Sequence, residues 1–131
     1  MKLEGRRIFR GKTTGEVLFS SEDISFYGGC DPETGEIVEK SHPLEGKSVS
    51  GKVLVFPTGK GSTVGSYVLY ALSKAGMAPL AIVNEATDPV VAVGCIIGEI
   101  PAIDQINIDK LEDGQKVEVD ADAGVISILE Q

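Results

Sequence analysis

Residues 52–76 read KVLVFPTGKGSTVGSYVLYALSKAG, and this stretch joins an apolar run, a loop of small residues and an amphipathic segment. The run from Lys52 to Phe56 has the β-branched, apolar character of a buried strand. The segment from Tyr67 to Gly76 has apolar residues at helical spacing and a terminal glycine. The sequence therefore predicts a strand and a helix that are joined by a loop at residues 57–66.

The loop at residues 57–66 ends at the N-terminus of the predicted helix. Free backbone N–H groups and the positive end of the helix dipole gather at such a point, so an anionic group is favoured there. Ser62 and Ser66 lie in that field, and we interpret the loop as an active site. A plainer alternative is that one of the two serines caps the helix and that the glycines only permit a tight turn.

Two nucleotide-binding motifs do not fit this loop. A Walker phosphate loop requires G-x-x-x-x-G-K-[S/T], but Lys60 precedes Gly61 and Ser62, and no later Gly-Lys-Ser/Thr follows. The glycines of the loop follow a G-x-G-x-x-x-G pattern, which is one residue longer than the dinucleotide fingerprint. Nucleotide hydrolysis and dinucleotide binding are therefore disfavoured.

Length and composition limit the class of protein. With 131 residues, of which 42% are hydrophobic, the chain fits one domain, residues 1–131, with a real core. It has no long uncharged apolar run and its first residues lack the apolar region of a signal peptide, so we expect a cytoplasmic protein with no membrane partner. The formal charge of −8 disfavours nucleic acid as a partner. Five basic residues near the N-terminus fit a solvated strand face: Lys2, Arg6, Arg7, Arg10 and Lys12.

The cysteines and the histidine give little support to a metal site or a catalytic triad. Cys30 and Cys95 are far apart and follow no C-x-x-C spacing, so we expect two buried, reduced thiols and no metal or iron–sulfur site within the chain. His42 is the only histidine and precedes a proline, which favours an extended loop. A Ser-His-Asp triad would have to use His42, and nothing in the sequence places the carboxylate that a triad needs.

The pattern elsewhere alternates between β and α. Residues 79–83 have the composition of another buried strand, and Asp88-Pro89 begins a second helix with a good N-cap and a proline at its first position. Strands that are joined by such a helix are expected to be parallel. Residues 114–129 alternate polar and apolar on both sides of a turn at 122–124, which predicts a β-hairpin. The predicted fold class is an α/β domain with a parallel βαβ core and additional antiparallel β-hairpins.

Two other segments complete the pattern. Residues 7–10 and 16–19 flank the turn-like residues 11–15 and predict a hairpin or a pair of short strands. Residues 27–51 are rich in glycine and proline, and an irregular segment of this length is unusual in a compact domain unless it has a function. We expect this segment to face the same site as the loop that carries Ser62.

The order of these elements resembles the swivelling β/β/α domain. In the phosphohistidine branch of that superfamily a histidine follows a Gly-Gly turn, and this chain has no histidine near such a turn. The aconitase branch fits better, because several independent motifs over nearly the full chain resemble the small subunit of the aconitase X family. These motifs are Phe26-Tyr27-Gly28-Gly29, Asp31-Pro32-Glu33-Thr34-Gly35, His42-Pro43-Leu44, Gly51-Lys52-Val53-Leu54-Val55, Gly59-Lys60-Gly61-Ser62 with Gly65-Ser66, and Asp88-Pro89-Val90-Val91.

The resemblance implies half of an enzyme. In that family a separate large subunit holds the iron–sulfur cluster, expected to be 4Fe-4S, and the small subunit supplies the serine of the Gly-Lys/Arg-Gly-Ser motif, here Ser62, as the catalytic base. We expect Lys60, Gly61 and Thr63 of the same loop to bind a small anionic hydroxy-acid substrate. Archaeal members with a separate small subunit are associated with the mevalonate route, in which (R)-5-phosphomevalonate is dehydrated to trans-anhydromevalonate 5-phosphate. Other members dehydrate hydroxyproline-type acids.

The chemistry of dehydration agrees with that role. Removing water across C2 and C3 of a 3-hydroxy acid requires a base for the proton α to the carboxylate and a Lewis acid for the hydroxide. A serine is a poor base in water, so Ser62 would need its alkoxide stabilised by Lys60, the loop N–H groups and the helix dipole. A second role for Lys60, binding the substrate's carboxylate or phosphate, stays open. We expect Ser66 to cap or begin the helix, and the competing hypothesis is a non-enzymatic swivelling or anion-binding module.

Overall fold

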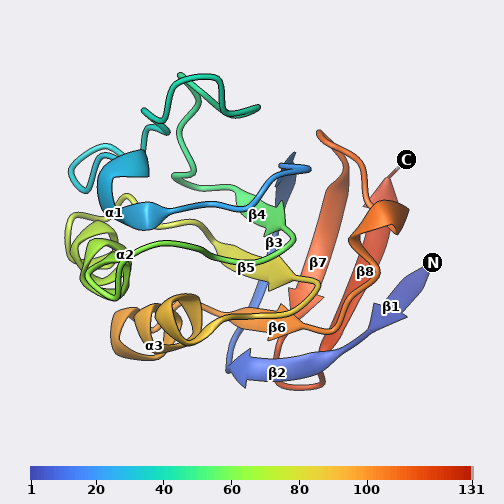
Figure 1. Ribbon diagram of the computed structural model, residues 1–131. Coiled ribbons are helices and arrows are strands. Elements are labelled where there is room, and N and C mark those ends of the chain that lie inside the picture. Colours follow the sequence, from blue (N-terminus) through green and yellow to red (C-terminus); the bar gives the residue numbers. More distant parts are fainter. Residues whose placement is uncertain (131) are drawn as a thin grey trace.

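Eight strands form one sheet in the computed structural model, which describes residues 1–130 (Figure 1). The strands lie in the order β1-β8-β7-β3-β4-β5-β6-β2. The pairs β3–β4, β4–β5 and β5–β6 are parallel, and the other pairs are antiparallel. The bounds of the strands are β1 Lys2–Glu4, β2 Arg6–Phe9, β3 Lys12–Phe19, β4 Val53–Phe56, β5 Ala81–Asn84, β6 Ala102–Asp104, β7 Lys116–Asp120 and β8 Val125–Glu130.

Three α-helices lie together on one side of the molecule, and the β7–β8 hairpin lies on the other (Figure 1). The helices are α1 Phe26–Gly29, α2 Gly65–Lys74 and α3 Pro89–Gly98, and a 3₁₀ helix, η1, covers Ile108–Lys110. Within residues 1–130, no helix has the length and apolar composition that crossing a membrane requires.

The sheet closes on itself at the N-terminal segment. β1 pairs with β8 at one end of the strand order, β2 pairs with β6 at the other, and only Gly5 separates β1 from β2. The N–H of Gly5 donates to the carbonyl oxygen of Gly124 at 2.7 Å, and a Cβ on Gly5 would lie 2.1 Å from the carbonyl oxygen of Asp104. Glycine at this position therefore lets one extended segment join the two ends of the sheet.

β4 is buried on both faces, and this burial anchors the loop that follows it. Leu54 and Phe56 pack with the apolar residues of the helices, whereas Val53 and Val55 pack on the opposite face with those of the β7–β8 hairpin. A parallel strand that is covered on both faces appears in the sequence as an unbroken apolar run rather than an alternating one. The neighbouring strand β5 is fully buried in the same way.

Most of the predicted elements are confirmed. The expected strand and helix of residues 52–76 are β4 and α2, the second pair is β5 and α3, and the expected C-terminal hairpin is β7–β8. β4 and β5 are parallel and α2 connects them, so the parallel βαβ core is confirmed. The α/β fold class with additional antiparallel structure is confirmed as well.

The predicted hairpin across residues 11–15 is wrong. β2 pairs with β6, whereas β3 begins at Lys12 and pairs with β7 and β4. Gly11 has a φ of +134°, a conformation that favours glycine, and it redirects the chain between the two strands. Residues 12–15 are strand instead of turn because β7 supplies them with backbone partners, as in the pairing of Thr13 with Val119. The alternative of two separate short strands is closer to what is observed.

Candidate active site

Two loops meet at the carboxyl ends of β4 and β5. The Ser62 loop, residues 57–64, joins β4 to α2, and the Asp88 loop, residues 85–88, joins β5 to α3. The N–H groups of Glu85 and Ala86 both donate to the carbonyl oxygen of Pro57, at 3.0 and 3.2 Å. In α/β folds, ligands commonly bind outside the carboxyl ends of the parallel strands. The position of the Ser62 loop therefore supports its interpretation as the site.

The hydroxyl of Ser62 is exposed and shapes the start of α2. Its Oγ accepts a hydrogen bond from the N–H of Val64 at 3.1 Å, and its carbonyl oxygen accepts one from the N–H of Gly65 at 2.9 Å. The helix has no acidic residue in its first turn and no side-chain hydrogen bond at its N-cap, Val64. The positive end of α2 therefore has no compensating carboxylate of its own in that turn.

Three consecutive N–H groups of the loop are left without a partner in the protein. Within residues 1–130, the N–H groups of Gly61, Ser62 and Thr63 donate to no backbone or side-chain acceptor. Gly61 has a φ of +91°, and a Cβ there would lie 2.5 Å from Oγ of Ser25, so the turn requires glycine. Successive N–H groups on a turn can form a concave anion site. Two expected substrate-binding residues, Gly61 and Thr63, thus lie on either side of Ser62.

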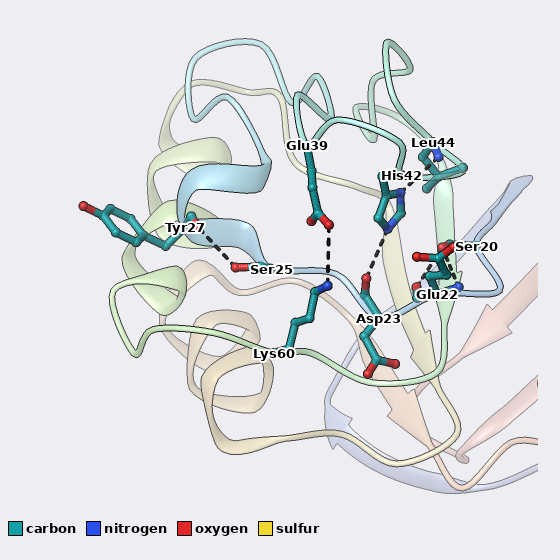
Figure 2. Close-up of polar contacts among 9 residues, drawn as sticks. All are labelled: Ser20, Glu22, Asp23, Ser25, Tyr27, Glu39, His42, Leu44 and Lys60. Carbon is teal, nitrogen blue, oxygen red and sulfur yellow. Dashed lines mark hydrogen bonds and ion pairs between the residues drawn. The ribbon is translucent and has the colours of Figure 1, made fainter.

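Lys60 points from the loop toward the irregular segment that precedes β4 (Figure 2). Its N–H donates to the carbonyl oxygen of Ile24 at 3.1 Å, and its Nζ lies 3.5 Å from Oε2 of Glu39. Both side chains of this ion pair are partly exposed. The ammonium group that we expect to meet a substrate anion is therefore held by a carboxylate of the same chain.

The irregular segment faces the Ser62 loop through the Glu39–Lys60 pair, as we expected, and the residues just before the segment also contact the loop. Ile24 forms a parallel bridge with Gly59. Figure 2 shows His42 above Asp23, where its Nε2 donates to the carbonyl oxygen of Asp23 at 3.1 Å while its Nδ1 accepts from the N–H of Leu44 at 3.0 Å. Both ring nitrogens of this buried histidine are used by the backbone. His42 therefore anchors the segment, which agrees with the weak support for a Ser-His-Asp triad.

Ser66 does not cap α2, so that part of the expectation is wrong. It lies in the first turn of the helix, which begins at Gly65, and its side chain is buried. Its Oγ donates to the carbonyl oxygen of Val90 at 2.7 Å. The hydroxyl joins α2 to α3 because it faces the neighbouring helix instead of the end of its own.

Carboxylates of the same chain accept hydrogen bonds from the N–H groups at the Asp88 loop. Oδ1 of Asp88 accepts from the N–H of Val91 at 3.1 Å, which confirms the predicted N-cap of α3. The buried Asp104 accepts from the N–H of Thr87 at 3.0 Å and binds the guanidinium of Arg6 through both oxygens, at 3.0 and 2.9 Å. The hydrogen bond to Asp104 and its charge raise the pKa of Arg6. The N-terminal end of α3 favours negative charge, and the carboxylates of Asp88 and Asp104 already supply it.

Two apolar hollows flank Tyr67, a residue that is 68% exposed. One has a volume of ≈ 490 Å³ and lies between the irregular segment and α2. The other has a volume of ≈ 390 Å³ and lies between α2 and α3. Their exposed apolar side chains are Tyr27, Val38, Val64, Tyr67, Val93 and Ile97. Exposed apolar side chains that gather in this way commonly mark a surface that contacts another protein.

The cysteines are unsuited to bind a metal. Both are free and buried. Burial, with a smaller contribution from Asp31, raises the pKa of the Cys30 thiol to about 12, and burial with a smaller contribution from Asp88 also raises the pKa of Cys95. Within residues 1–130, no three His, Cys, Asp or Glu side chains are grouped so that they could hold a metal ion. The donor set of this chain therefore does not fit an iron–sulfur cluster.

Sequence reasoning missed two acidic residues that shape this edge. Glu39 pairs with Lys60, 21 positions away, and Asp104 pairs with Arg6, 98 positions away. Contacts at such separations leave no local pattern, so no signal in one sequence could have found them.

Comparison with known proteins identifies the family. The family model of the aconitase X swivel domain matches residues 2–128. The chain is 52% identical to the phosphomevalonate dehydratase small subunit of Thermococcus kodakarensis, over 99% of this chain and 98% of that protein. It is 54% identical to the protein of the same name from Methanosarcina acetivorans, over 98% of this chain and 92% of that protein. The crystal structure of Thermococcus kodakaraensis aconitase X in its holo-form superposes with a TM-score of 0.98 at 52% identity and covers 99% of each chain. The resemblance seen in the sequence motifs is therefore confirmed.

Proposed function

The chain belongs to the aconitase X swivel domain family, and we propose that it is the small subunit of a phosphomevalonate dehydratase, a hydro-lyase of the mevalonate route. Relatives with that name are about half identical to it over nearly the full chain. The proposed reaction removes water from (R)-5-phosphomevalonate to give trans-anhydromevalonate 5-phosphate. We take residues 1–131 as one swivel-type domain that acts in the cytoplasm.

The observation that carries this proposal is the open turn around Ser62. Ser62 takes the proton from C2 of the substrate, the C2–H electron pair forms the C2=C3 double bond, and hydroxide leaves from C3. Ser62 is exposed and belongs to a run of three successive residues whose N–H groups have no acceptor within residues 1–130, at a helix end without an acidic first turn. Such a field lowers the free energy of an alkoxide and favours the serine as a base.

Lys60, Gly61 and Thr63 bind the anionic substrate in this proposal. The acidic proton is α to the carboxylate, so the carboxylate lies one bond from the carbon that Ser62 attacks. The N–H groups of Gly61 and Thr63 and the ammonium of Lys60 belong to the same turn as Ser62. Positive charge at the carboxylate also stabilises the negative charge that develops there when the proton is lost.

The second half of the site comes from a large partner subunit. An aconitase-like dehydratase uses an iron–sulfur cluster, here 4Fe-4S, which supplies the Lewis acid for the departing hydroxide. We assign the cluster to the partner because the thiols of this chain are buried and their pKa values are raised. The two apolar hollows beside Ser62 give the partner a surface that it can cover, which would also exclude water from the exposed serine.

Reconstitution tests the function. The chain and its large subunit are combined anaerobically, and 5-phosphomevalonate and hydroxyproline-type acids are assayed for loss of water. We expect turnover of 5-phosphomevalonate by the pair, and no turnover or iron–sulfur absorbance from the chain alone. Turnover of only a hydroxyproline-type acid would assign another dehydratase, and a chain that binds an anion without any partner or turnover would indicate a binding module.

A further inference from the structure

The Lys60–Glu39 ion pair places a carboxylate beside the ammonium of the proposed substrate-binding turn. The atoms Nζ and Oε2 are 3.5 Å apart, and the two side chains point toward each other in Figure 2. The backbone of the Glu39 segment is held on both sides, because the N–H of Val38 donates to Gly29 at 2.9 Å and the N–H of His42 donates to Glu39 at 3.3 Å. The carboxylate therefore approaches Lys60 from an ordered segment.

We propose that the Glu39 carboxylate occupies, in the absence of substrate, the place at Lys60 that the substrate's carboxylate takes during catalysis. This inference rests on the proposed function, in which the substrate's carboxylate lies next to the carbon that Ser62 deprotonates. Both groups are carboxylates, so they make the same contact with an ammonium group. Two carboxylates at one ammonium group repel each other. The substrate's carboxylate therefore pairs with Lys60 only when the Glu39 carboxylate moves away from it.

The magnitude of the effect follows from the exposure of the pair. Both side chains are partly exposed, at 46% for Lys60 and 33% for Glu39. Ion pairs that are this exposed are weak, so the ammonium is unpaired in about a sixth to two fifths of the molecules. A ligand that needs the unpaired state then binds about two- to sixfold more weakly than it would without Glu39. Glu39 is thus a positioning residue that sets the affinity for the substrate through Lys60.

Removing only the charge of Glu39 tests the inference. Calorimetry measures the binding of mevalonate, which has the carboxylate but no phosphate, to the complex with the large subunit. With Glu39→Gln we expect binding to tighten about two- to sixfold. The KM for 5-phosphomevalonate should fall by the same factor without a gain in kcat, and both effects should shrink at high salt. Glu36→Gln, an exposed charge change in the same segment, is the matched control and should change neither value.

The dependence on Lys60 decides the outcome. In a Lys60→Gln background, Glu39→Gln should give no further tightening. Unchanged or weaker mevalonate binding with Glu39→Gln would overturn the inference, and so would tighter binding that persists in the Lys60→Gln background. In either case, normal turnover by the wild-type complex would leave the proposed function intact. A wild-type complex that neither binds mevalonate nor turns over 5-phosphomevalonate would overturn both.

Discussion

The Ser62 loop and the Asp88 loop occupy equivalent places in the fold, yet their polar groups are used differently. Each follows a buried four-residue parallel strand and precedes a ten-residue helix. In the Asp88 loop the helix end is capped by Asp88, and Asp104 binds the N–H of Thr87. In the Ser62 loop the first turn of the helix has no acid, and three successive N–H groups have no acceptor within residues 1–130.

This difference shows how one fold separates structure from chemistry. A parallel βαβαβ arrangement presents two helix ends at one edge of the sheet, and both favour negative charge. The chain fills one end with its own carboxylates, which fixes the loop. The other end has small residues, the exposed Ser62 and no acid in the first turn of its helix, and within residues 1–130 its Lys60 is paired only with the partly exposed Glu39, so an external anion can provide the missing charge. The Ser62 loop is therefore the one suited to bind a substrate.

The largest expected effect comes from a substitution in the Ser62 loop, the loop with the free helix end. Ser62→Ala should lower turnover of the reconstituted complex by roughly 10²–10⁴, as expected for the loss of a general base, with little change in fold. Steady-state kinetics measures the change. Ser66→Ala is the matched control, since it loses a buried hydrogen bond to Val90 and should cost about 1 kcal/mol of stability with turnover retained. Equal losses of turnover in both variants would contradict the assignment.

The second prediction tests whether the two loops are packed as one unit. A Cβ on Gly59 would lie 2.4 Å from Oδ1 of Asp88 and 2.5 Å from Cγ2 of Val91. Gly59→Ala should therefore destabilise the protein by about 1–3 kcal/mol through overpacking. Urea denaturation measures the loss. Gly98→Ala is the control, because a Cβ there meets its nearest neighbour at 3.4 Å, an ordinary contact. Equal stability of the two variants would show that the loops are not tightly packed.

The third prediction removes the carboxylate that caps the helix after the Asp88 loop. Asp88→Ala removes the N-cap of α3 and should lower the free energy of unfolding by about 0.5–2 kcal/mol. The turnover of the folded complex should fall far less than with Ser62→Ala, because Asp88 has a structural role in this account. A stability measurement paired with kinetics checks both statements. Loss of turnover without loss of stability would move the chemistry to the Asp88 loop.

The fourth prediction concerns a buried thiol that lines the hollow beside the Ser62 loop. The pKa of Cys30 is raised from 9.0 to about 12. At pH 8 the folded protein should react with iodoacetamide about a thousandfold more slowly than an unfolded control, since the thiolate is the nucleophile. The folded state holds the Cys30 proton more tightly than the unfolded state does, because the pKa is raised on folding. The resulting contribution to the free energy of unfolding is fully present below about pH 9 and is lost as the pH rises toward 12. A Cys30→Val variant should show a weaker alkaline loss of stability, and an equal loss would contradict the assignment.

The sequence predicted the parts of this fold that depend on local pattern. The apolar runs of β4 and β5, the helix spacing of α2 and the Asp88 cap are each encoded within a few neighbouring residues. The hairpin at residues 7–19 failed because β2 and β3 pair with β6 and β7, roughly a hundred residues later. Glu39 and Asp104 were missed for the same reason. Ser62 was singled out by its motif, but only the structure shows that the N–H groups of residues 61–63 have no acceptor within residues 1–130.

The most direct measurement of the central claim follows the proton at C2 of the substrate. The reconstituted complex hydrates trans-anhydromevalonate 5-phosphate in heavy water, and proton NMR detects deuterium at C2 of the 5-phosphomevalonate that forms. The account predicts incorporation by the wild-type complex and a rate at least about 100-fold lower with Ser62→Ala. Incorporation at the wild-type rate by a Ser62→Ala complex that binds the ligand normally would show that Ser62 does not carry the proton.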